Sequence, residues 1–153
     1  MSEATSIADE LKEIHDGNAW HGPALQESLA GLTAERAAAR PIQNAHSIWE
    51  IVSHIAGWED VICQRLEGKP LTQPEEGDFP EPDEVSEAAW ARTLARLNET
   101  HERLLEAIAH LSDADLDKVT AGKDYSVRKM LHGAIHHHVY HAGQIALLRK
   151  AFT

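Results

Sequence analysis

The amino-acid sequence predicts an all-α protein folded as a four-helix bundle, and three observations support this prediction. No segment alternates apolar and polar residues as a half-buried strand would, and no hairpin dipeptide joins two β-branched runs. Apolar residues recur instead at steps of three and four, the spacing of a helix buried along one face. A serine precedes each of the three longest runs, as a helix N-cap does. We therefore expect residues 1–153 to form a single domain without a β-sheet core.

The first helical segment is expected to be broken or kinked near its middle. Its apolar residues fall into two stripes, one of Ile7, Leu11 and Ile14 and another of Leu25, Leu29 and Leu32. Between the stripes, residues 17–23 contain two glycines, an asparagine and a proline, which interrupt helices. A short connection, TAERAAARPIQNAH, leads to the next helix.

The second helix is predicted near residues 47–67. Ser47 is a good N-cap, and Glu50 three residues later completes a capping box. The apolar side chains of this helix are Ile48, Ile51, Val52, Ile55, Trp58, Ile62 and Leu66. Gly68 and Pro70 end it and open a loop, GKPLTQPEEGDFPEPDEV, that is rich in proline and acidic residues. We expect this loop either to cross the end of the bundle or to cover a pocket.

The third and fourth helices are predicted near residues 86–111 and 126–150, with Ser86 and Ser126 as N-caps. The third carries a regular seam of Trp90, Leu94, Leu97, His101, Leu104, Ile108 and Leu111. The inward positions of the fourth include Val127, Met130, Ala134, His137, His141, Ile145 and Leu148. Packing alone does not require imidazoles at two of these inward positions, so they call for a chemical explanation.

Charge and composition exclude several classes of partner. The net charge is -11, from 14 Lys and Arg against 25 Asp and Glu, so nucleic acid and anionic lipid surfaces would be repelled. The amino-terminal stretch is polar and acidic, and no apolar run approaches the roughly 18 residues that span a bilayer. We expect a cytoplasmic protein. Its single cysteine, Cys63, is interpreted as a small buried residue of the second helix.

The fourth helix places four histidines within six residues, in the run HHHVYH. His137 and His141 are four residues apart, so their imidazoles project from one face of the helix. His54 is the best candidate for a third ligand, because its face of the second helix also carries Ile51 and Trp58. Three neutral imidazoles with an open position are typical of catalytic zinc, and imidazole also binds nickel, iron and copper. The competing interpretation is that these are hydrogen-bonded core histidines.

The other histidines are weaker candidates for metal ligands. His136 is expected at the surface, His132 to point outward, and His138 to lie at the opposite edge of the apolar stripe, so solvated roles are favoured for all three. His101 lies on the seam of the third helix, where it is either a hydrogen-bonded core residue or part of a pocket lining.

Three segments together resemble the DinB-like (YfiT-like) superfamily of metal-dependent enzymes. These segments are GNAWHGPALQESLAGLTAERAAARP, SIWEIVSHIAGWE and HHHVYHAGQIALLRK, and the resemblance extends from about residue 17 to the end. It implies a four-helix bundle in which one histidine of the second helix and an i, i+4 pair of the last bind a divalent metal. Those positions match His54, His137 and His141. Zinc or nickel is the expected metal, with iron or manganese as alternatives.

The same resemblance implies a class of activity. Similar proteins include thiol S-transferases that use bacillithiol or mycothiol, and a mycothiol-dependent maleylpyruvate isomerase. We therefore expect a transferase that joins a low-molecular-weight thiol cosubstrate to an electrophilic small molecule, and a homodimer. A metal-dependent hydrolase, a metal-binding stress-response protein without turnover, and a purely structural helical dimer are the alternatives.

Four residues are candidates for substrate binding: Trp20, His21, Trp58 and His101. Trp20 and His21 lie in the interrupted part of the first segment, where a loop can reach the open end of the site, although plain packing explains them equally well. Tyr140 precedes His141 and is left out of the catalytic assignment, because it can face a neighbouring helix or subunit. Glu50 is one turn before His54 and is a candidate to fix its tautomer, but the capping box is the simpler role.

Overall fold

The computed structural model describes residues 1–152 and forms an all-α bundle over that range, as predicted. The helices are α1 (Glu3–Asp16), α2 (Leu25–Leu29), α3 (Ala34–Ala38), α4 (Ile48–Leu66), α5 (Glu87–Ala109), α6 (Asp113–Leu116) and α7 (Val127–Arg149), followed by the 3-10 turn η1 (Lys150–Phe152). These residues form no β-strand, and one isolated bridge joins Val119 to Ser126. No helix among them is both long and apolar enough to cross a bilayer.

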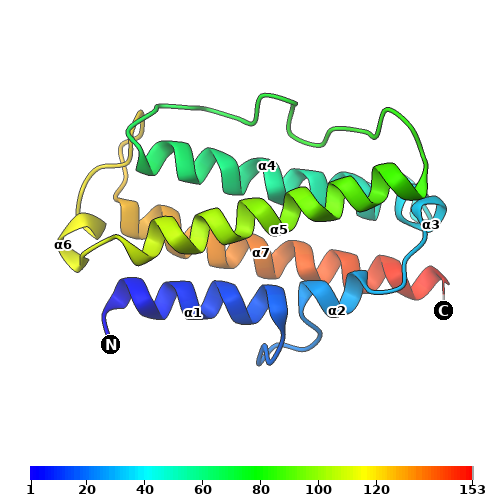
Figure 1. The fold of residues 1–153 in the computed structure, drawn as a ribbon, viewed down its shortest axis with the longest axis horizontal. Coiled ribbons are helices and arrows are strands. Elements are labelled where there is room, and N and C mark those ends of the chain that lie inside the picture. The colour runs from blue at the N-terminus through cyan, green and yellow to red at the C-terminus, as the bar shows by residue number, and fades with distance from the viewer. Residues whose placement is uncertain (153) are drawn as a thin grey trace.

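The bundle consists of α1, α4, α5 and α7, which lie side by side in Figure 1, with α2 continuing the line of α1. Helices α1 and α7 run in one direction, and α4 and α5 run in the other. Because α4 and α5 are parallel, the chain between them must return along the whole length of α4. Residues 68–85, which we call the strap, make this return.

Serine caps fix the starts of the three long helices at the predicted positions. Ser47, Ser86 and Ser126 each precede a helix, and the hydroxyl of each accepts a hydrogen bond of 3.1 Å from the backbone N–H three residues later. Glu50 completes the capping box at Ser47. These caps set the register of the helix faces that carry the histidines.

The first segment is divided, as predicted, into α1 and α2. The break begins at Gly17 and Asn18, and Asn18 has a φ of 64°, in the left-handed region that ends a helix. Two short helices were not predicted. One is α3, inside the connection between residues 33 and 46, and the other is α6, just after α5.

A close approach between Gly57 and Pro74 holds the strap against α4. A Cβ added at Gly57 would lie 3.0 Å from the Cβ of Pro74, so any larger residue would push the strap outward. This contact brings Asp78 and Phe79 of the strap over the middle of α4. Of the two paths considered for this loop, the structure has the one that covers a pocket.

The apolar core is divided into two clusters with a polar layer between them. One cluster includes Ile55 of α4, Leu97 of α5 and Ile145 of α7, and the other includes Ile62, Leu104 and Ile135 of the same helices. The polar layer contains the buried side chains of His15, His54, Glu59, Thr100, His101, His138 and His141. The histidines therefore lie at mid-height in the bundle, with apolar packing on both sides to fix the helices.

Candidate metal centre

The structure brings His54 of α4 together with His137 and His141 of α7. One nitrogen from each ring can be chosen so that all three lie within 4.8 Å of one another, and these residues form a group able to hold a metal ion. The Nε2 atoms of His54 and His137 are 2.8 Å apart. The three rings are mutually tilted by 51° to 83°, so their in-plane lone pairs can point to a common centre.

Hydrogen bonds from the far sides of two rings fix their tautomers. The Nδ1–H of His54 donates to the backbone oxygen of Asp78 at 2.7 Å, and that of His141 donates to Oε1 of Gln144 at 2.6 Å. Each bond leaves the Nε2 lone pair free for a metal, which is the usual arrangement around metal-binding histidines. Glu50 does not serve His54 and instead bonds Ser47, Arg40 and His46.

The three imidazoles are neutral at physiological pH. Burial, followed by the nearby His141, His138 and His54, lowers the pKa of His137 to about 3. Burial lowers the pKa of His141 to about 4, although its bond to Gln144 opposes the change. Burial also lowers the pKa of His54. Neutral imidazole is the form that binds metal, so the donor set fits a borderline divalent cation such as zinc or nickel.

A cavity of about 580 Å³ lies beside the three histidines, between α4, α7 and the strap. Phe79 of the strap stacks on His54, with ring centroids 3.9 Å apart and planes within 2°. Trp58, one of the substrate-binding candidates, lines the cavity, and its indole N–H donates to the carboxylate of Asp78 at 2.8 Å. Tyr140 is 65% exposed and also reaches the cavity wall. The volume is in the range of small-molecule sites.

The remaining substrate-binding candidates lie elsewhere. Trp20 and His21 are exposed in the loop between α1 and α2. This loop lies at the junction of α1 and α2, whereas the strap runs along α4 (Figure 1). His101 is 3% exposed in the polar layer and does not line the cavity beside His54. Cys63 is buried as predicted, and burial raises the pKa of its thiol to about 11.

The prediction of a solvated His138 is wrong. His138 is 1% exposed, its Nδ1 donates to the backbone oxygen of Ala134 at 2.6 Å, and its Nε2 lies 3.6 Å from the carboxylate of Glu59. Helix α7 contacts α1, α2 and α4, so its buried arc is wider than the one stripe assigned from spacing. His136 is exposed and His132 is partly exposed beside Glu3, as expected.

Glu59 is a buried charge that sequence reasoning missed. It is 0% exposed, and its Oε2 lies 3.5 Å from Nδ1 of His101 as well as close to His138. Burial opposes its ionisation, but the interactions with His101 and then His138 outweigh burial and lower the pKa of Glu59. A signal was present, because Glu59 falls on the apolar stripe between Ile55 and Ile62.

A second group, His15, Asp16 and His101, meets the same distance criterion for holding an ion. Its ring geometry is less suitable, because His15 and His101 stack with centroids 3.8 Å apart and planes within 7°. The lone pairs of two stacked, parallel rings do not point to one centre. Those of the mutually tilted rings of His54, His137 and His141 can. We therefore take His54, His137 and His141 as the candidate metal centre.

Comparison with known proteins identifies the family of the chain. The family model described as the DinB superfamily matches residues 19–145, well over half of the chain. No curated protein and no solved structure matched in the corresponding searches. The matched range contains α4, the strap and all three histidines of the candidate centre. The chain belongs to the DinB superfamily.

Proposed function

We propose that the protein is a metal-dependent thiol S-transferase acting on an electrophilic small molecule, with His54, His137 and His141 holding the metal. The observation that carries this proposal is the meeting of three neutral imidazoles at the wall of a cavity of small-molecule size. A divalent metal in such a site, with a position left open, acts as a Lewis acid that lowers the pKa of a thiol or water.

The protein's own residues orient the histidines that would hold the metal. Asp78 and Gln144 orient the rings of His54 and His141, and Phe79 covers one face of His54. Cys63 is buried, and its raised pKa keeps it protonated at neutral pH, so the nucleophile must arrive as a cosubstrate. In the transfer the thiol gives its proton to the solvent, its sulfur bonds to the electrophilic carbon, and the leaving group departs with the electrons of the bond that breaks.

A thiol-consumption assay tests this function. Zinc- or nickel-loaded protein is incubated with bacillithiol, mycothiol or cysteine, each paired with monochlorobimane or another alkylating electrophile, and free thiol is followed. We expect consumption that requires the metal, disappears in His137→Ala and persists in His136→Ala. Metal binding without consumption of any thiol would support the stress-response alternative. Ester cleavage that needs no thiol would support a metal-dependent hydrolase.

A further inference from the structure

We propose that the cavity beside the three histidines contains an anion subsite, formed by Arg65 with Lys129 and Tyr125, for the carboxylate of a small molecule whose apolar part fills the cavity. The proposal names a substrate class for the proposed function. It rests on that function only for the reaction at the histidines, and not for binding of the carboxylate at Arg65.

Arg65 is a buried cation without a counter-charge. Among residues 1–152 it is the only buried lysine or arginine, at 6% exposure, and no carboxylate of these residues lies within 4.0 Å of it. The chain carries a net charge of -11, so acidic side chains are abundant. Buried charges in proteins are normally paired, because an unpaired charge loses its hydration without compensation. The missing partner is therefore expected from outside the chain.

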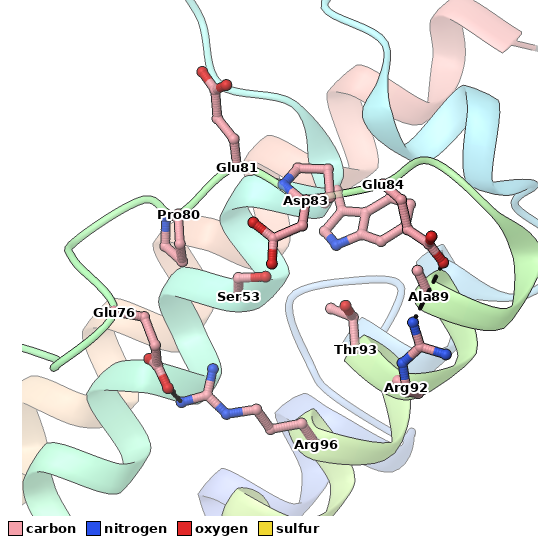
Figure 2. Close-up of a pocket in the computed structure, with 12 residues that line it drawn as sticks. Ser53, Glu76, Pro80, Glu81, Asp83, Glu84, Ala89, Arg92, Thr93 and Arg96 are labelled. Atoms are coloured by element: carbon pink, nitrogen blue, oxygen red, sulfur yellow. Dashed lines mark hydrogen bonds and ion pairs between the residues drawn. The ribbon is translucent and has the colours of Figure 1, made fainter.

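The pocket on the other side of the strap gives a direct contrast (Figure 2). There Arg96 pairs with Glu76 at 2.9 Å, and Arg92 pairs with Glu84 at 3.5 Å. Both arginines extend from α5 toward acidic residues of the strap, so this pocket already supplies its own anions. In the cavity lined by Arg65, no carboxylate of residues 1–152 forms an ion pair with the arginine.

The guanidinium of Arg65 is held in place with donors to spare. Its Nε–H donates to the backbone oxygen of Leu71 at 2.8 Å, and Nη1 donates to the hydroxyl of Tyr125 at 3.2 Å. Trp58 lies beneath it, with the guanidinium carbon 5.7 Å from the ring centroid. A guanidinium has five N–H donors, so about three remain for a ligand. Nη2 is not among the fully buried unpaired atoms, and Arg65 lines the cavity.

The cavity links this cation to the histidines along one face of α4. His54, Trp58, Ile62 and Arg65 follow one another at helical spacing and all line it. His54 and Arg65 are eleven positions apart, which corresponds to about 16 Å along a helix axis. Lys129 and Tyr125 line the same end as Arg65, and the Lys129 ammonium lies 5.8 Å from the Tyr125 ring centroid. A ligand that meets both ends is an apolar-bodied anion rather than a simple ion.

Gly133 provides a way to block the cavity without touching Arg65. It lies on α7 in the cavity wall, and a Cβ placed there would meet no atom within 4 Å. A leucine at this position therefore has room to extend into the cavity while the helix stays intact. Gly133→Leu therefore tests the cavity even if the protein does not fold with a substitution at the buried Arg65.

Calorimetric titration of metal-free protein tests the proposal. The protein, kept in EDTA, is titrated with 4-phenylbutyrate and with its neutral analogue 4-phenylbutyramide. We expect the acid to bind about tenfold or more tightly than the amide, as a charged hydrogen bond implies. Arg65→Gln should abolish the preference, Lys129→Gln should reduce it, and Gly133→Leu should prevent binding of both compounds. Arg96→Gln, a matched change in the other pocket, should have no effect.

Equal binding of acid and amide by the unaltered protein, or a preference that survives Arg65→Gln in folded protein, would overturn the subsite. So would a preference that appears only after zinc is added, because the carboxylate would then be a metal ligand. Since the main titration contains no metal, a failure of zinc to bind the histidines would refute the proposed function and leave the subsite result intact.

The carboxylate can belong to the thiol or to the electrophile, and an experiment with cobalt-loaded protein distinguishes the two. Binding of 6-mercaptohexanoate and of 6-mercaptohexanol is followed by the absorption band that a thiolate gives when it binds cobalt. If the thiol supplies the anion, the acid binds more tightly and Arg65→Gln removes the difference. If the electrophile supplies it, the two thiols bind equally, and 4-phenylbutyrate still binds the thiol-loaded protein. Loss of 4-phenylbutyrate binding together with equal thiol affinities would contradict both assignments.

Discussion

The Nδ1–H of His54 donates to the backbone oxygen of Asp78 across 2.7 Å, and this bond joins a candidate metal ligand on α4 to the strap. The carboxylate of Asp78 also lies 3.0 Å from the same nitrogen and accepts a bond from Trp58. The position of the strap therefore decides the tautomer and orientation of His54, and metal affinity should depend on it.

Displacing the strap should weaken metal binding. Gly57→Val places a side chain where Pro74 now lies, 3.0 Å from a Cβ at position 57, so the strap and Asp78 must move. We expect zinc affinity to fall by about tenfold or more, as loss of an outer hydrogen-bond partner does, with helix content unchanged in circular dichroism. Gly143→Val on α7, where a Cβ meets no atom within 4 Å, is the control. Equal zinc affinity in both variants would refute this role of the strap.

Removing the charge of Glu59 should destabilise the bundle strongly. Glu59→Ala leaves His101 and His138 buried without their shared carboxylate, and such a loss typically costs about 3 to 5 kcal/mol. Replacing all three residues by leucine should recover most of this loss, because an apolar layer needs no ionic partner. Urea unfolding measures both effects. A triple variant less stable than Glu59→Ala would mean that the polar layer itself stabilises the fold.

Stability should fall on mild acidification because of His15. Burial, followed by the nearby His101, lowers the pKa of His15 from 6.5 to about 4. Between these values His15 binds a proton in the unfolded chain and not in the folded protein, which favours unfolding. The stability that neutral His15 allows is therefore fully present above pH 6.5 and is lost as the pH falls toward 4. From pH 7 to 5 it amounts to about 2 kcal/mol.

His15→Gln removes this titration and provides the measurement. The free energy of unfolding of metal-free protein should drop between pH 7 and 5 by about 2 kcal/mol more than that of the variant. His136→Gln, a change at an exposed histidine, should follow the unaltered protein. Parallel stability curves for the unaltered protein and His15→Gln would show that His15 does not titrate abnormally.

A homodimer is predicted, with α7 as the face to test. Tyr140 is 65% exposed and Leu147 is 61% exposed, and they lie seven residues apart on this helix. Light scattering should give twice the chain mass of 16.9 kDa, and Leu147→Glu should give the monomer mass. Val119→Glu, at a position 69% exposed that pairs with Ser126 just before α7 and does not lie on that helix, should remain dimeric. A monomer mass for the unaltered protein would reject the dimer.

The fold was largely predictable because its main signals are local. Ser47, Ser86 and Ser126 cap the long helices at the expected places, and the four-residue spacing of His137 and His141 fixes their common face. The family resemblance implied that this pair meets His54, and the antiparallel packing of α4 and α7 brings the three residues together.

The features that were missed depend on tertiary structure. Helices α3 and α6 have five and four residues, too few to show a helical period. Asp78 reaches His54 from a strap whose Pro74 packs on Gly57, and the composition of the strap does not encode this packing. A single apolar stripe on α7 predicts a solvated His138, whereas α1, α2 and α4 all pack against this helix and widen its buried face.

Zinc affinity of single histidine variants, measured by competition with a chelator on untagged protein, tests the central claim most directly. The unaltered protein should bind one zinc per chain. His54→Ala, His137→Ala and His141→Ala should each lower the affinity by more than about a hundredfold, beyond the effect of losing an outer partner, while His136→Ala should leave it unchanged. Full affinity in His54→Ala, with loss in His101→Ala or His138→Ala, would contradict the assignment.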